Sequence, residues 1–309
     1  MIVSASRRTD IPRWYAPWLM NRLREGYALV RNPMNAGQIS RVSLLPEAVD
    51  CFVFWSKDPA PLMPYLDAID RMGYRYYFQF TLTPYGRDLE CGLRDKAELE
   101  EDFITLSRRV GRERVVWRYD PVILDAVHTL AWHKAQFLRL CRRFSDYTDT
   151  ITVSFVDLYP KLHALGLHII TPEEMTELAA FFGATARKLG LRCTACAEAG
   201  DFSAQGVFRA ACIDRERIEK LCGAPLRLPR DKNQRPGCGC CQSVDIGAYN
   251  TCPNGCVYCY ANSSLKTAQC HYAAHDPQGE LLFGAVPEGA KIIRREAPSC
   301  RTRQMRLDL

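Results

Sequence analysis

The stretch from residue 75 to residue 119 contains one complete strand–helix–strand unit. It reads "RYYFQF" (75–80), then "AELEEDFITLSRRVG" (97–111), then "RVVWRY" (114–119). The outer runs are rich in aromatic and β-branched residues, which favour strands, and the central run has helical spacing and ends on a glycine. Two strands joined through a helix lie parallel, with a right-handed crossover. The stretch therefore predicts a parallel sheet covered by helices.

The same alternation extends over most of the chain. Further strands are predicted at "IVSAS" (2–6), "CFVFW" (51–55), "TITVSF" (150–155), "LRCTAC" (191–196) and "SVDIGAY" (243–249). A second helix is predicted over 171–190, with Thr171 as its N-cap and Pro172 in its first turn. Six or seven such units predict a complete or partial (β/α) barrel of the TIM type, with a doubly wound open sheet as the alternative. We expect residues 1–192 to form the core and residues 193–309 to complete it within one structural domain.

Composition indicates a globular protein in which the cysteines are unevenly distributed. The chain has 309 residues, 47% of them hydrophobic and 25% charged. No apolar run is long enough for a signal peptide or a membrane span, so we expect a cytoplasmic protein with no membrane partner. Eleven of the 15 cysteines lie between Cys193 and Cys270. Because disulfides rarely persist in the cytoplasm, this clustering predicts metal binding or redox chemistry.

Polar residues follow nearly every predicted strand. In parallel α/β barrels the chemistry lies on the loops that leave the carboxyl ends of the strands, so these residues are expected to share one rim. This pattern favours a barrel, of partial type, over the open doubly wound sheet. The polar positions are Ser6 to Asp10, Ser56 to Asp58, Thr81, Thr83, Arg118, Asp120, Ser154, Asp157, Cys196, Glu198 and Cys252.

The segment "YNTCPNGCVYCYAN" (249–262) carries three cysteines in one short loop. They are Cys252, Cys256 and Cys259. Zinc takes four ligands, and Cys270 or His271 would have to supply the fourth. Alternatively, a C-x3-C-x2-C loop can bind three irons of a 4Fe–4S cluster and leave the fourth iron open to an external ligand. An open coordination position indicates chemistry rather than a purely structural metal.

The stretch "CPNGCVYCYAN" resembles the cluster motif of radical S-adenosylmethionine enzymes, especially the branch that contains spore photoproduct lyase. The resemblance implies that S-adenosylmethionine chelates the open iron and is cleaved reductively to a 5′-deoxyadenosyl radical, which acts on an unknown substrate. A reductant such as flavodoxin or ferredoxin would supply the electron. Cys252, Cys256 and Cys259 would then be the catalytic cluster ligands.

Three further motifs extend this resemblance. "SRRTDIP" (6–12) is similar to the Thr/Ser-Asp motif of that branch, "VFWSKDP" (53–59) to its lysine-bearing strand, and "FQFTLT" (78–83) to the next strand, which ends in a hydroxyl. A lysine ammonium suits a carboxylate, and hydroxyls suit an ammonium or a ribose. The cofactor-binding residues implied by the resemblance are Thr9, Asp10, Lys57, Thr81 and Tyr258, with Tyr258 near the adenine.

The order of the motifs differs from that branch, in which the cysteine motif comes first. The difference implies a circular permutation, in which the strand before the cysteine loop still neighbours residues 2–6 in space. The whole chain also resembles an uncharacterised bacterial family of unknown function, with "TD" near the start and "DIGAYNTCPNGCVYCYAN" near the end. That second resemblance implies no substrate.

The remaining cysteines predict a second metal site. We expect an auxiliary 4Fe–4S cluster, or zinc, bound by Cys196, Cys212, Cys238 and Cys240. Cys193 and Cys241 would be spare, because neighbours on a strand point to opposite faces.

The alternative to a radical enzyme is a function of a different class. It is a non-catalytic zinc or iron–sulfur protein that binds nucleic acid through the basic segment 225–237 and the tail 291–309. A plain surface loop and a solvated chain end are the simpler interpretations of these two segments.

Overall fold

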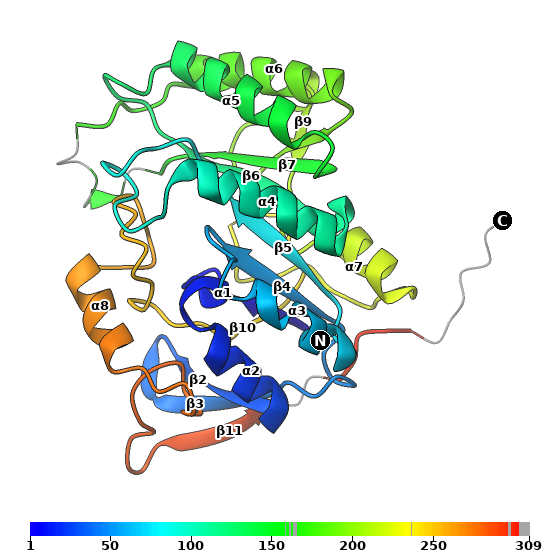
Figure 1. Ribbon diagram of the computed structural model, residues 1–309, viewed down its shortest axis with the longest axis vertical. Helices are drawn as coiled ribbons and strands as arrows, with labels where there is room; N and C mark the ends of the chain where they lie inside the picture. The colour runs from blue at the N-terminus through cyan, green and yellow to red at the C-terminus, as the bar shows by residue number, and fades with distance from the viewer. Residues whose placement is uncertain (158, 161, 163–165, 236, 296–297, 303–309) are drawn as a thin grey trace.

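The computed structural model describes the chain except residues 158, 161, 163–165, 236, 296–297 and 303–309 (Figure 1). Its largest element is an eight-stranded sheet with the strand order β10-β1-β4-β5-β6-β7-β8-β9, in which neighbouring strands are parallel. The strands are β1 (Ile2–Ala5), β4 (Cys51–Ser56), β5 (Tyr76–Thr81), β6 (Val115–Val122), β7 (Thr150–Phe155), β8 (Arg192–Ala195), β9 (Val207–Arg209) and β10 (Val244–Asp245).

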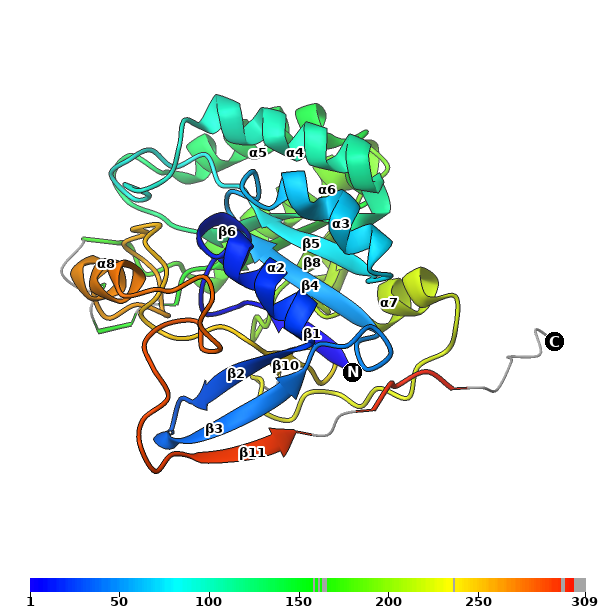
Figure 2. The same ribbon diagram turned by 60° about the horizontal axis from the view of Figure 1, so that its bottom comes forward.

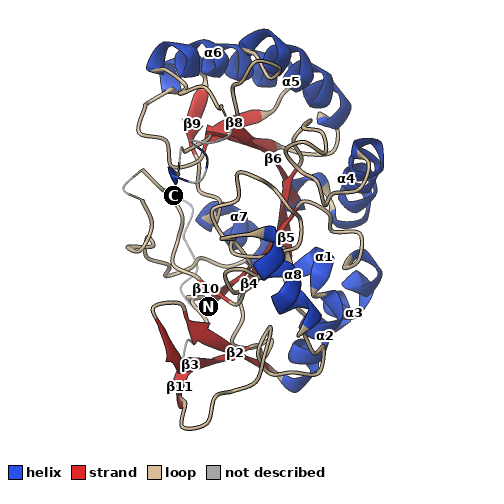
Figure 3. Cartoon of the chain, turned by 90° about the vertical axis from the view of Figure 1, so that its left-hand side faces the viewer, coloured by secondary structure: helices blue, strands red, loops and turns tan. Residues whose placement is uncertain are grey.

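Helices cover one side of this sheet. In Figure 3 the strands follow a curve, and the larger helices lie along its convex side. They are α2 (Ala16–Glu25), α3 (Leu66–Arg71), α4 (Lys96–Val110), α5 (Leu130–Phe144) and α6 (Pro172–Lys188). Short helices α1 (Ile11–Trp14), α7 (Arg215–Cys222) and α8 (Leu265–Ala273) lie elsewhere in the chain.

Two apolar clusters occupy the two faces of the sheet, because side chains alternate along each strand. Phe52 and Phe78 pack with Phe103 of α4 and Phe137 of α5 in the larger cluster, under the helices. The second cluster, on the other face, includes Val53, Tyr77, Val116, Cys212, Cys238 and Cys240. Burial on both faces explains why the strands read as nearly continuous apolar runs.

Helix α6 begins as the sequence predicts. Thr171 is its N-cap, and its hydroxyl accepts a hydrogen bond from the backbone N–H of Glu174 at 3.2 Å. The Glu174 carboxylate accepts one in return from the backbone N–H of Thr171 at 2.8 Å. This reciprocal capping box satisfies two of the backbone donors that a helix start leaves unpaired.

All seven predicted strands belong to the main sheet, and β9 is an eighth that the sequence did not reveal. The predicted strand over 243–249 is reduced to the two residues of β10. It pairs in parallel with β1, with Val3 opposite Val244. The expectation that the strand before the cysteine loop neighbours residues 2–6 is therefore confirmed.

The sheet is open, so the expected partial barrel of the TIM type is not confirmed. Its edge strands β9 and β10 are not paired with each other. Residues 210–243 connect them through α7 and loops, and the two strands have only three and two residues, so they offer few backbone groups for a closing ladder. The expected boundary after residue 192 falls inside β8, and β9 and β10 extend the same sheet beyond it.

A second, three-stranded sheet was missed by the sequence analysis. It has the order β11-β3-β2 and is formed by β2 (Tyr27–Asn32), β3 (Asn35–Ser43) and β11 (Lys291–Arg295). Figure 2 shows it as a separate layer beside β1 and β10. Strand β11 is exposed along its whole length, and its charged residues gave no strand pattern. No helix in the described part of the chain has the length and apolar character needed to span a bilayer.

The buried His133 of α5 predicts a pH-dependent loss of stability. Its Nδ1 lies 2.8 Å from the Tyr119 hydroxyl and its Nε2 lies 2.7 Å from the carbonyl oxygen of Ile123. Burial lowers the pKa of His133 to about 4 from its ordinary 6.5. The folded state therefore favours the neutral ring, and this contribution to stability is lost as the pH falls from about 6.5 towards about 4.

Urea unfolding of the protein and of His133→Gln at pH 7 and pH 5 tests this expectation. The free energy of unfolding of the natural protein should fall by about 2 kcal/mol more than that of the variant over this interval. Equal losses in the two proteins would contradict it.

Candidate functional site

The carboxyl ends of the strands surround a cavity of about 910 Å³. Every strand of the main sheet contributes to it through its carboxyl-terminal residues or the loop that follows, β9 through Cys212. The lining includes the polar positions predicted for the rim, except Asp58 and Thr83. The structure thus brings the ends of all eight strands to one site, as expected for the carboxyl edge of a parallel sheet.

The three loop cysteines line this cavity. Cys252 is buried, and Cys256 and Cys259 are half-buried. The loop is held by Asn254, whose side-chain oxygen accepts hydrogen bonds from Arg13 Nη1 at 2.6 Å and from the indole of Trp14 at 2.7 Å. These contacts fix the loop against α1, so the position of the cysteines is set by the first turn after β1.

Asp10 fastens the cysteine loop to β1 and β4. Its carboxylate accepts hydrogen bonds from the hydroxyl of Ser56 at 2.7 Å, the backbone N–H of Lys57 at 2.8 Å, and the side-chain amide of Asn254 at 3.1 Å. It also caps α1 through the backbone N–H of Arg13 at 3.1 Å. Burial raises the pKa of Asp10, although these hydrogen bonds oppose that shift. Both carboxylate oxygens of Asp10 already accept hydrogen bonds from the protein. The role of Asp10 is therefore to hold these segments of the site in position.

Glu90 is a central residue that the sequence analysis missed. Its buried carboxylate accepts hydrogen bonds from Lys57 Nζ at 2.7 Å and from the Thr83 hydroxyl at 2.8 Å. Lys96 and the Tyr258 hydroxyl also donate to it. Burial alone would raise the pKa of Glu90, but the two ammonium groups lower it to about 2. No motif surrounds Glu90 in the sequence, and only its neighbour Cys91 draws attention to this segment.

The remaining predicted cofactor residues lie around this network. Lys57 is paired with Glu90, and its ammonium lies 5.5 Å from the centre of the Tyr258 ring. Thr81 lines the cavity. Thr9 is 4% exposed, and no group in the described part of the chain forms a hydrogen bond with its buried hydroxyl. A buried polar atom without a partner is rare in proteins and indicates a site that a ligand completes.

Four further cysteines gather on another part of the same cavity wall. Cys196 follows β8, Cys212 follows β9, and Cys238 and Cys240 precede β10. The sulfurs of Cys196 and Cys212 are 3.4 Å apart, and the backbone N–H of Cys240 lies 3.5 Å from the sulfur of Cys238. Gly239 lies between Cys238 and Cys240 and packs closely against Ala210. A Cβ atom at this position would be only 2.7 Å from the carbonyl oxygen of Ala210.

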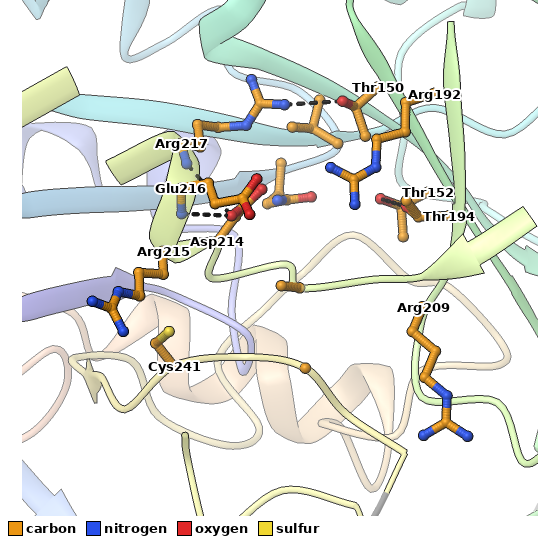
Figure 4. A pocket seen from close by; sticks show the side chains of 14 residues that line it. Thr150, Thr152, Arg192, Thr194, Arg209, Asp214, Arg215, Glu216, Arg217 and Cys241 are labelled. Carbon is orange, nitrogen blue, oxygen red and sulfur yellow. Dashed lines mark hydrogen bonds between the residues drawn. The ribbon is translucent and has the colours of Figure 1, made fainter. Parts of the chain in front are cut away.

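The two cysteines expected to be spare lie apart from this group. Cys193 packs in the helix-covered cluster on the opposite face of β8. Cys241 lines a separate pocket of about 250 Å³ near the amino ends of β7 and β8, shown in Figure 4. Beside that pocket Arg217 pairs with Asp149 at 2.7 Å. Arg217 also donates to the Thr150 hydroxyl at 3.0 Å (Figure 4).

Arg118 connects the second cysteine group to the rim. One guanidinium nitrogen donates to the sulfur of Cys212 at 2.8 Å, and another pairs with Asp120, which also accepts from Ser154. Arg118 and Asp120, both predicted as polar rim residues, therefore form an ion pair in the structure. Glu198 accepts from the backbone N–H of Phe155 at 2.9 Å, and burial raises the pKa of Glu198 to about 7.

The fold and the site define an α/β protein with an open parallel sheet and a cysteine-lined cavity at its carboxyl edge. The sequence model of a family described as "Domain of unknown function (DUF1848)" matches residues 2–261, so the chain belongs to that family. No curated protein and no solved structure matches the chain. Within the described residues, no three His, Cys, Asp or Glu side chains form a group that is ready to hold a metal ion as they stand.

The Glu90 network generates a stability prediction. Glu90→Gln keeps the shape of the side chain but leaves two largely buried ammonium groups without a counter-charge, so the free energy of unfolding should fall by about 3 to 5 kcal/mol. Urea unfolding of metal-free protein measures this loss. The matched control is Glu98→Gln, because Glu98 forms an exposed pair with Arg94 and its removal should cost less than about 1 kcal/mol. Similar small losses in both variants would contradict the assigned role of Glu90.

Proposed function

We propose that the protein is a radical S-adenosylmethionine enzyme whose 4Fe–4S cluster is held by Cys252, Cys256 and Cys259. The observation that carries the proposal is the position of these three cysteines, on one short loop that faces the cavity at the carboxyl edge of the sheet. When bound, the cluster and S-adenosylmethionine would supply a 5′-deoxyadenosyl radical that removes a hydrogen atom from a substrate. A small reductant such as flavodoxin or ferredoxin would deliver the electron.

The charges beside the loop fit the methionyl group of the cofactor. Lys57 and Lys96 share the single carboxylate of Glu90, so these three residues together carry one net positive charge. Such a group favours a carboxylate. The free, buried hydroxyl of Thr9 supplies a hydrogen-bonding position on the same wall. These residues would therefore orient the cofactor and exclude water from it.

Tyr258 and Thr81 fit the other end of the cofactor. The Tyr258 ring is buried, 6.1 Å from the Tyr85 ring, and is held in place by the bond from its hydroxyl to Glu90. A fixed aromatic ring of this kind offers a stacking surface for adenine. Thr81 ends β5 on the cavity wall, where its hydroxyl can reach a ribose.

The topology supports a permuted partial barrel as the finer description of the fold. Strand β10 leads into the cysteine loop and lies beside β1 in parallel. In space it takes the place of a first strand, although along the chain it is the last strand of the main sheet. The curved, open sheet with helices on its convex side is compatible with a barrel that lacks closure (Figure 3).

Part of the basic segment 225–237 lines the cavity. Of its described residues, Asp231, Asn233, Gln234 and Arg235 line the cavity. Arg235 also pairs with Asp157, another lining residue, at 2.5 Å. This part of the segment would therefore form part of the cavity wall. Residues 303–309 of the tail, offered above for nucleic acid, lie outside the described residues.

Cofactor cleavage tests the proposal directly. Anaerobically reconstituted and reduced protein is expected to convert S-adenosylmethionine slowly to 5′-deoxyadenosine without added substrate, as measured by chromatography. The variant in which Cys252, Cys256 and Cys259 are all replaced by alanine is the control and should give none. A protein that holds iron at the loop but shows neither turnover nor a spectral change on cofactor addition would overturn the assignment.

A second prediction concerns the cofactor's carboxylate. Lys57→Ala should leave the iron content unchanged but weaken S-adenosylmethionine binding about ten- to a hundredfold, because a charge-assisted hydrogen bond contributes roughly 1.5–3 kcal/mol. Anaerobic calorimetry measures the affinity. Lys188→Ala, at the far end of α6, is the matched control and should bind normally. Normal binding by both variants would remove Lys57 from the cofactor site.

A further inference from the structure

The second cysteine group is built from three separate chain segments that meet at the cavity wall. These segments follow β8, follow β9 and precede β10, and they contribute Cys196, Cys212, Cys238 and Cys240. Besides the sulfur contact of 3.4 Å between Cys196 and Cys212, the backbone N–H of Ile213 points at the sulfur of Cys240 from 3.4 Å. Thiols brought together from segments so far apart in sequence are typical of a metal site in a protein without disulfides.

Three side chains with N–H donors line the cavity together with these four cysteines. Arg118 already donates to Cys212 at 2.8 Å. The Nη2 atom of Arg7 and the indole N–H of Trp55 are buried and have no hydrogen-bond partner among the residues that the structure describes. Trp55 packs in the same cluster as the cysteines, and the guanidinium groups of Arg7 and Arg118 lie over its ring at 5.2 Å and 5.1 Å. Two buried, unpartnered donors at one place indicate acceptors that the protein alone does not supply.

The charges at this place also require an anionic partner. Arginine stays charged in proteins, and the side chains of Arg7 and Arg118 are only 18% and 5% exposed. Arg118 has Asp120 as a counter-charge, whereas the contact of Arg7 with Asp231 is long, at 4.0 Å. The other carboxylate beside Arg7 is Asp245, which accepts a hydrogen bond from the Arg7 backbone N–H and is shared with the guanidinium of Arg8 at 3.9 Å. Neutral thiols would leave this positive charge poorly balanced, but metal-bound thiolates would balance it.

We propose that Cys196, Cys212, Cys238 and Cys240 bind a second iron–sulfur cluster, of the 4Fe–4S type, which accepts N–H···S hydrogen bonds from Arg7, Trp55 and Arg118. A zinc ion is the other occupant that suits four thiolates. A zinc ion brings no acceptor atoms of its own for Arg7 and Trp55, whereas a cluster brings its sulfides. In a cluster each cysteine binds a different iron, so the sulfurs need not converge on one point, and small side-chain rotations would separate Cys196 from Cys212. The inference does not depend on the proposed function, because it uses none of the loop cysteines.

The variant with Cys252, Cys256 and Cys259 replaced by alanine isolates this site. After anaerobic reconstitution it should be brown and hold about four irons and about four sulfides per chain. Adding Cys212→Ala should abolish this iron, while adding Cys193→Ala, the matched control on the opposite face of β8, should not. A folded triple variant that holds zinc or no metal would overturn the proposal.

The N–H donors around the proposed cluster are tested by its reduction potential, in variants that keep all four cysteine ligands. In the triple variant, Trp55→Phe removes the indole N–H but keeps an aromatic ring for Arg7 and Arg118. The iron content should stay the same, and the reduction potential should become more negative, because N–H···S bonds stabilise the reduced cluster. Trp117→Phe is the control, since the indole of Trp117 donates instead to the carbonyl of Leu82, and its potential should not move. If the two variants have the same reduction potential, Trp55 does not donate a hydrogen bond to the cluster.

Discussion

The carboxylate of Asp10 holds together three segments that are distant in the sequence. It bonds the start of α1, the end of β4 and the cysteine loop at Asn254, and it is buried among them. A buried carboxylate without such donors would be costly, so the three segments and the carboxylate depend on one another. Since Asn254 lies between Cys252 and Cys256, the geometry of the candidate cluster site follows from this one side chain.

The cavity has two chemically different sides. Beside the loop cysteines the charges are ammonium groups around Glu90, which are compact and suit a bound carboxylate. Beside the other four cysteines they are guanidinium groups stacked on Trp55, which suit sulfur acceptors and a delocalised negative charge. Both sides are reached from the same space, so a substrate in the cavity would lie within reach of both groups of cysteines.

The order of the chain and the order of the strands differ at one edge of the sheet. Strand β10 comes after seven other strands of the main sheet but lies beside β1, and the loop that follows it returns to the rim next to the loops of β1 and β4. The last third of the chain therefore adds the edge strands β9 and β10 and supplies all the cysteines of the two groups except Cys196. Membership of the DUF1848 family extends over this arrangement, because the match runs from residue 2 to residue 261.

The sequence by itself determined the local features. Seven strands, helix α6 with its N-cap Thr171, and the polar strand ends follow from patterns within a few residues, and the periods of strands and helices make such patterns readable. Only the tertiary structure decided that the sheet stays open, that a second sheet forms from residues 27–43 and 291–295, and that Glu90 and Trp55 belong to the site. These features depend on contacts between segments far apart in the chain. A lone Glu90 or Trp55 carries no local pattern, so its role arises only when folding buries it beside Lys57 or Arg118.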